Sequence, residues 1–134
     1  MKKPLDILLI EDDIDDIDLL KDALADNKVA YHMDIIMEGD KVYSYLKSAE
    51  TLPGIIVMDL NLPKTDGKEL LLKLKSSFQL TEIPIVILTT SSSKADIDYC
   101  NKMGIRKFIT KPATMEGWNN TIHSIVNVAC NFPN

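Results

Sequence analysis

Short apolar runs and longer amphipathic stretches alternate along the whole chain. Three runs are almost continuously aliphatic, at positions 5–10, 55–58 and 83–88, and weaker runs lie at 33–37 and 107–110. Strands that are covered on both faces have this composition, because neither face needs polar side chains. The pattern therefore predicts five short strands, with the run at 33–37 nearer an edge of the sheet.

Apolar residues recur at helical spacing in the interval after each strand. A spacing of three or four positions places them on one face of a helix. The predicted helix stripes are Ile17, Leu20 and Leu24; Val42, Tyr45, Leu46 and Ala49; Leu70, Leu71 and Leu74; Ile97, Cys100 and Met103; and Trp118, Ile122, Ile125 and Ala129. Thr114 is expected to cap the last helix, and Glu116 suits its first turn.

A strand followed by a helix, five times over, predicts an α/β fold. Right-handed crossovers then give a doubly wound, five-stranded parallel sheet, a (βα)5 three-layer sandwich. The chain shows no internal repeat and no interdomain linker, so we expect one domain over residues 1–134. The tail at 131–134 is too short to hold an output domain.

The composition excludes several classes of function. The net charge of -5 and the pI of about 4.9 argue against a nucleic-acid partner, which would require clustered Lys and Arg. No segment reaches the roughly 20 apolar residues that cross a membrane. The apolar stretch after the basic start contains Asp6 and stops at Glu11, too short for a signal peptide. Together with two cysteines that have no metal-like spacing, this predicts a cytoplasmic protein.

Polar side chains follow four of the five predicted strands. In an open parallel sheet, ligand sites lie outside the carboxyl ends of the strands, so these residues are expected to converge on one edge. The residues are Glu11, Asp12 and Asp13 after the first strand; Asp59 and Asn61 after the third; Thr89, Thr90 and Ser91 after the fourth; and Lys111 and Pro112 after the fifth.

A cluster of carboxylates next to a lysine favours phosphoryl chemistry. Carboxylates that lie close together resist ionisation unless a cation neutralises them, and an all-oxygen ligand set suits Mg²⁺. Asp59 is then placed to attack a phosphoryl group while Lys111 and the metal offset its negative charge. The predicted chemistry is phosphoryl transfer to a carboxylate.

The stretches that carry this cluster resemble a known family. Positions 8–13, 57–63, 66–67, 87–91 and 109–112 are similar, in order and spacing, to receiver domains of two-component response regulators. The resemblance covers essentially the whole chain and implies a flavodoxin-like fold. The amino-acid sequences of three loops are most similar to those of the stand-alone regulators that partner bacterial phytochromes.

The resemblance implies a role for each site residue. Asp59 is expected to be the phosphoacceptor and a metal ligand. Asp12 would bind Mg²⁺ directly, Glu11 would bind it through water, and the backbone carbonyl of Asn61 would complete the protein ligands. Lys111 is expected to pair with the phosphoryl oxygens. Glu11 stands where the family more often has Asp, an exchange that preserves the charge.

The resemblance also implies the parts of a switch. Thr89 supplies the hydroxyl that moves toward the phosphate, and Phe108 takes the place of the aromatic rotamer switch. The peptide bond between Lys111 and Pro112 is expected to be cis. Thr90 departs from the family, which usually has Ala or Gly there. Because a larger side chain beside the phosphate hinders an attacking water, we hypothesise slow loss of the phosphoryl group.

The predicted function is signalling rather than metabolic catalysis. A sensor histidine kinase or a phosphotransfer protein would supply the phosphoryl group, and the resemblance suggests a kinase of the phytochrome type. The output would be contact with a downstream protein or a second copy of the chain, through the face formed by the fourth helix, fifth strand and fifth helix. The chain would catalyse only its own phosphorylation and dephosphorylation.

Two other functions stay open. The first is a Mg²⁺-dependent phosphohydrolase with an aspartyl-phosphate intermediate, but Asn61 stands where such enzymes carry a second Asp. The second is an interaction domain that does not respond to phosphate. His32 and His123 could indicate a phosphohistidine carrier, yet neither joins the acidic cluster, and we interpret both as structural.

The acidic residues that follow the cluster are interpreted as structural. Asp13 is expected to start the first helix. Asp15, Asp16 and Asp18 are interpreted as residues that favour the helix dipole and solubility. Asp66 and Gly67 are expected to set the geometry of a turn.

Overall fold

A five-stranded parallel sheet forms the centre of the protein. The computed structural model describes residues 3–77 and 79–131; the segment 132–134 of the tail lies outside the described residues. The strands are β1 (Leu5–Ile10), β2 (Tyr31–Ile36), β3 (Ile55–Met58), β6 (Ile85–Thr89) and β7 (Lys107–Thr110), in the spatial order β2-β1-β3-β6-β7. Every adjacent pair in this sheet is parallel. The predicted doubly wound α/β fold is confirmed.

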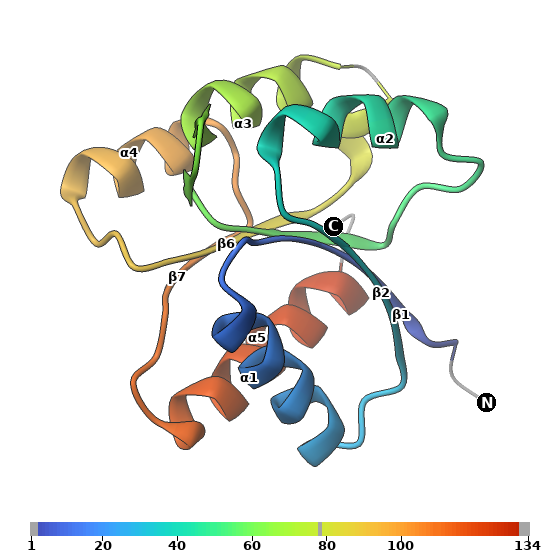
Figure 1. Cartoon of the computed structure of the whole chain (residues 1–134), viewed down its shortest axis with the longest axis vertical. Coiled ribbons are helices and arrows are strands. Elements are labelled where there is room, and N and C mark those ends of the chain that lie inside the picture. Colours follow the sequence, from blue (N-terminus) through green and yellow to red (C-terminus); the bar gives the residue numbers. More distant parts are fainter. Residues whose placement is uncertain (1–2, 78, 132–134) are drawn as a thin grey trace.

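Helices cover both faces of the sheet, as Figure 1 shows. Helices α1 (Ile14–Asp26) and α5 (Met115–Asn131) lie on one face, and α2 (Val42–Ser48), α3 (Gly67–Ser76) and α4 (Lys94–Lys102) lie on the other. Two short 3-10 turns, η1 (Gly39–Lys41) and η2 (Leu80–Glu82), and a small hairpin of β4 (Asn61–Leu62) and β5 (Thr65–Asp66) complete the described elements. The result is three layers.

The core divides into two clusters, one on each side of the sheet. In β3, Ile55 and Val57 pack with the α1 and α5 side, whereas Ile56 and Met58 pack with the α2, α3 and α4 side. All four side chains are fully buried. This burial on both faces explains why the strands read as continuous apolar runs rather than alternating ones.

The ends of two strands differ from the prediction. Strand β6 begins at Ile85 rather than at position 83, because Ile83 ends the η2 turn and Pro84 has no N–H to donate to a ladder. Strand β2 begins earlier than expected, at Tyr31, which pairs with Leu5. The prediction that β2 lies at an edge of the sheet is confirmed.

Side-chain caps fix where the helices begin next to the sheet edge. Asp13 accepts a hydrogen bond from the backbone N–H of Asp16 and starts α1. Thr114 accepts one from Gly117 at 3.0 Å, which confirms its predicted capping role. Among the described residues, no helix combines the length and apolar character that a membrane span requires.

Candidate phosphoryl-transfer site

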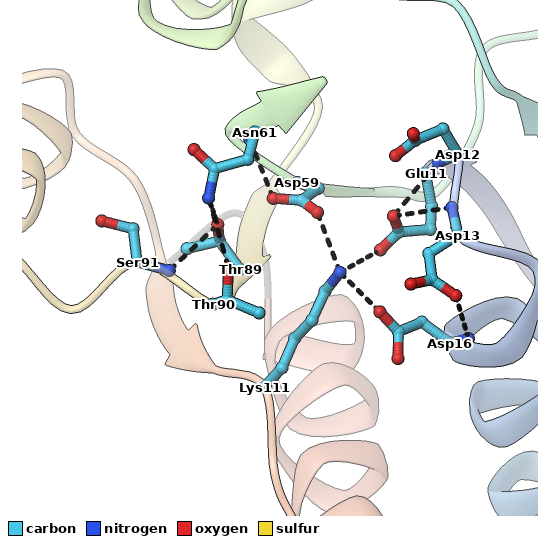
Figure 2. A network of polar contacts seen from close by, with 10 residues as sticks. All are labelled: Glu11, Asp12, Asp13, Asp16, Asp59, Asn61, Thr89, Thr90, Ser91 and Lys111. Carbon is cyan, nitrogen blue, oxygen red and sulfur yellow. Dashed lines mark hydrogen bonds and ion pairs between the residues drawn. The ribbon is translucent and has the colours of Figure 1, made fainter. Parts of the chain in front are cut away.

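The carboxyl ends of β1, β3, β6 and β7 bring the predicted polar residues to one edge of the sheet (Figure 2). Backbone hydrogen bonds continue from the ladders into the site. The N–H of Asp59 donates to the carbonyl of Ile10 at 3.0 Å, and that of Lys111 donates to the carbonyl of Thr89 at 2.8 Å. The sheet therefore fixes the backbone from which the acidic and basic side chains extend.

The ammonium group of Lys111 lies at the centre of the site. Its Nζ donates to Glu11 Oε1 at 2.8 Å, to Asp59 Oδ2 at 2.8 Å and to Asp16 Oδ2 at 2.7 Å. The Lys111 side chain is only 8% exposed. Each of its three N–H bonds thus has a carboxylate acceptor, which fixes the ammonium between β1, β3 and α1 (Figure 2).

Backbone N–H groups hold the second oxygens of the two buried carboxylates. Glu11 Oε2 accepts from the N–H groups of Asp12 and Asp13 at 3.1 and 3.2 Å. Asp59 Oδ1 accepts from the N–H of Asn61 at 2.9 Å. Both carboxylates are buried, yet both have hydrogen-bond partners on each oxygen, so their orientation is set before any ligand arrives.

Burial and the neighbouring charges together set the electrostatics of the site. Burial raises the pKa of Glu11, and the neighbouring Asp59 charge adds to the rise, against hydrogen bonds from Lys111 and the Asp13 backbone that lower it. Burial alone would lower the pKa of Lys111, but hydrogen bonds to Asp16, Asp59 and Glu11 together outweigh burial and raise it. The lysine is therefore charged, and the acidic cluster favours a further cation.

Three carboxylates are placed to hold a metal ion. Glu11, Asp12 and Asp59 each offer an oxygen, and these oxygens lie within 4.8 Å of one another. Hard divalent cations prefer such oxygen ligands, and the Asp59 charge contributes, after burial, to the raised pKa of Glu11. The donor set therefore fits a divalent cation. The backbone carbonyl of Asn61 as a further ligand stays a prediction.

A second group of polar residues lies beside Asp59. The side-chain amide of Asn61 donates to the hydroxyl oxygens of Thr89, at 3.2 Å, and Thr90, at 3.3 Å. The N–H of Ser91 also reaches the Thr89 oxygen, at 3.4 Å. Thr89 is fully buried, whereas Thr90 is exposed. Thr89 is the last residue of β6 and Thr90 follows it, and Figure 2 shows both on the side of Asp59 opposite Asp12.

The model of the response regulator receiver domain matches residues 7–123. The chain belongs to this family. Response regulator Rcp1 of Synechocystis sp. is 30% identical over 118 residues, which are 84% of this chain and 80% of that protein. This receiver is therefore a phosphoacceptor module of a two-component system, as the resemblance implied.

Two solved structures have the same fold along almost their entire length. The phosphorylated cyanobacterial phytochrome response regulator RcpA superposes with a TM-score of 0.86 at 31% identity, covering 98% of each chain. The Mn²⁺-bound form of Rcp1 superposes with a TM-score of 0.84 at 27% identity, also covering 98% of each chain. One relative is thus phosphorylated, and the other holds a divalent metal.

The predicted switch residue Phe108 lies on β7, which β6 separates from the strands that precede the acidic residues, β1 and β3. It pairs with Ile87 across β6 and β7, is half-buried, and packs against the core cluster on the α4 side. A side chain in this position contacts the interior and also reaches the surface, as a rotamer switch requires. The switching role of Phe108 and the cis peptide before Pro112 stay predictions.

The interpretation of Asp16 as a solubility residue was incomplete. Its side chain is 21% exposed and binds the Lys111 ammonium, so it belongs to the site of this receiver. The helical pattern alone does not reveal this contact, because the partner lies 95 positions away. The one available signal was its position in the first turn of a helix that starts beside the acidic pair.

The structure supports a structural role for Asp66, Gly67 and the two histidines. Asp66 caps α3 through the N–H groups of Lys68 and Glu69, and a Cβ at Gly67 would lie 2.4 Å from the Leu60 carbonyl oxygen. Only glycine therefore lets α3 start this close to the segment after Asp59. The two histidines lie away from the site: His32 contacts Asp34, and His123 contacts Asn27.

Proposed function

We propose that this receiver is a phosphorylation switch in which Asp59 accepts a phosphoryl group from a histidine kinase in a Mg²⁺-dependent reaction. One observation carries the proposal: Lys111 Nζ lies 2.8 Å from Asp59 Oδ2, inside a set of carboxylates that fits a divalent cation. The nucleophile, the cation ligands and the ammonium are thus arranged around one point at the sheet edge.

The reaction is a displacement at phosphorus. A carboxylate oxygen of Asp59 forms a bond to phosphorus as the P–N bond of the kinase phosphohistidine breaks. The bonding electron pair leaves with the imidazole nitrogen, which then takes a proton from water. A Mg²⁺ ion held by Glu11, Asp12 and Asp59 would supply positive charge to the phosphoryl oxygens. Lys111 supplies the rest through an N–H that already points at Asp59.

Thr89 is proposed to read the phosphoryl group. Its hydroxyl oxygen accepts hydrogen bonds from Asn61 and Ser91, so its proton is available for a phosphoryl oxygen. Movement of Thr89 toward Asp59 would loosen those contacts and allow Phe108 to change rotamer. The phosphoryl group then favours a state that the free protein already samples, and the face of α4, β7 and α5 changes its affinity for a partner.

The partners and the metal follow from the chemistry and from the relatives. RcpA is a phytochrome response regulator, so a phytochrome-type sensor kinase is the proposed input. The proposed output is contact with a downstream protein or a second copy of this chain, which acts as a single receiver domain. Mg²⁺ is the proposed ion because the donors are all oxygen, and the relative Rcp1 has been solved with a divalent cation, Mn²⁺, bound.

The test is phosphorylation by a small donor. Purified protein is incubated with acetyl phosphate, with Mg²⁺ or with EDTA, and the intact mass is measured. We expect one added phosphoryl group with Mg²⁺, none with EDTA and none on Asp59→Asn. Asp66→Asn is the matched control, because Asn also caps a helix and the residue lies outside the cluster.

The same samples test the rival function. A phosphohydrolase would release p-nitrophenol from p-nitrophenyl phosphate steadily. A switch would release at most about one p-nitrophenol per protein, because Asp59 stays phosphorylated until its own phosphoryl group is lost. Steady turnover that depends on Asp59 would favour the phosphohydrolase. Absence of any added mass under conditions that label a known receiver would leave the phosphate-independent interaction domain.

A further inference from the structure

Of the carboxylates that contact Lys111 in the described part of the chain, Asp16 alone lies outside the metal-holding group. It extends from the first turn of α1, and its Oδ2 is 2.7 Å from the ammonium nitrogen. Glu11 and Asp59 also bind this ammonium, but both belong to the three carboxylates that fit a cation. Their charge is therefore shared between two cations, whereas Asp16 directs its charge to Lys111 alone.

A count of charges shows why this contact matters for the proposed reaction. Glu11, Asp16 and Asp59 contact the one ammonium, and Asp12 lies beside Glu11 and Asp59. A divalent cation would leave this set of four carboxylates and one ammonium with one net negative charge. Without Asp16 the set would be neutral. An incoming phosphoryl group is an anion, so it meets a net negative charge to which Asp16 contributes without serving the metal. It must also share an ammonium that three carboxylates already contact.

We propose that Asp16 is a positioning residue that competes with the phosphoryl group for the ammonium of Lys111. The inference rests on the proposed function, because it assumes that Lys111 pairs with a phosphoryl group on Asp59. Asp16 holds Lys111 on the α1 side of the site and so disfavours the phosphorylated state. It sets how much phosphodonor is needed to switch the receiver on, and it takes no part in metal binding or in nucleophilic attack.

The neighbouring Asp15 provides a matched control. It lies one position earlier in the same first turn and is exposed, and its side chain has no hydrogen bond or ion pair within the described residues. Replacing Asp15 or Asp16 by Asn removes the same charge from the same end of the helix. Only the change at Asp16 removes a carboxylate from Lys111, so the difference between the two variants isolates that contact.

The experiment measures binding of beryllofluoride, an anion that mimics the phosphoryl group on a carboxylate, at saturating Mg²⁺. We expect Asp16→Asn to lower the midpoint concentration about fivefold, the upper range for a partly exposed charge interaction. Asp15→Asn should change it less than about twofold, because its charge is exposed and screened. The Mg²⁺ concentration at half-saturation, read separately without beryllofluoride, should change little in either variant.

Two results would overturn the proposal. An unchanged or raised midpoint for Asp16→Asn would mean that Asp16 does not compete, or that it instead anchors the lysine for the phosphoryl group. An equal effect of Asp16→Asn in a Lys111→Met background would mean that it does not act through Lys111; we expect the effect to disappear there. If Lys111→Met binds too weakly, the Asp15 comparison still decides. Binding to wild type that survives Asp59→Asn would refute the proposed function instead.

Discussion

Removal of the Lys111 ammonium should destabilise this receiver strongly when no divalent cation is present. In Lys111→Met the aliphatic stem stays, but Glu11 and Asp59, both buried, and the partly buried Asp16 lose their shared counter-ion. Removing one partner of a buried ion pair costs about 3–5 kcal/mol. Because Asp16 is partly exposed and the variant can protonate Glu11, we expect the low end, about 3 kcal/mol.

The measurement is urea or thermal unfolding at pH 7 with EDTA, followed by far-ultraviolet circular dichroism. A loss of that size corresponds to a fall in Tm of about 10 °C for a domain of this length. The control is Lys107→Met, an exposed lysine on the same strand, β7, for which we expect a change within about 0.5 kcal/mol. Mg²⁺ should restore more stability to Lys111→Met than it adds to wild type, since it replaces the missing positive charge.

Equal unfolding free energies for Lys111→Met and Lys107→Met would refute this reasoning. They would show that the three carboxylates on Lys111 do not need the ammonium, either because water screens them or because they take up protons on folding. A loss that Mg²⁺ does not reverse would instead point to lost packing of the lysine stem rather than to charge.

Three further predictions test separate parts of the structure. Thr90→Ala should lose its phosphoryl group about threefold faster, roughly 0.7 kcal/mol of barrier, in a time course of intact mass; equal lifetimes would end the shielding hypothesis. Glu11 has a raised pKa in the folded protein, so folding favours its protonated form. Without metal, the stability that Glu11 contributes should therefore be lost as the pH rises from 4.5 through that pKa. Over the same pH range, the urea midpoint of Glu11→Gln should fall less than that of wild type. Asp96 pairs with Lys68 at 2.6 Å and accepts a hydrogen bond from the Ser91 hydroxyl. Asp96→Asn should lower the free energy of unfolding by about 0.5–1 kcal/mol and speed amide exchange at the start of α4. Unchanged exchange would mean that these contacts do not hold the helix.

The fold of this receiver could be predicted because strands that are buried on both faces appear in the sequence as continuous apolar runs. Strands β3 and β7 end where the apolar runs predicted, since a polar residue follows each of them directly at the sheet edge. The start of β6 could not be predicted from hydrophobicity, because Ile83 is nearly as buried as the strand itself but caps the end of the η2 turn. The β4–β5 hairpin was missed because two-residue strands have no periodicity.

The site was predictable to the extent that it follows strand ends. Glu11, Asp59, Thr89 and Lys111 all lie where a parallel sheet places its ligands, so position along the chain was enough. Asp16 was not predictable in this way. It reaches the site from a helix, and its contact depends on where the long Lys111 side chain ends, a property of tertiary packing alone.

The central claim is that Asp59 carries the phosphoryl group, and locating that group on the chain tests it most directly. Protein treated with acetyl phosphate and Mg²⁺ is reduced with borohydride, which converts an aspartyl phosphate to homoserine, and is then digested and sequenced by tandem mass spectrometry. The account predicts homoserine at position 59 and nowhere else. Homoserine at Asp12 or another carboxylate, or none in protein that has gained a phosphoryl mass, would contradict it.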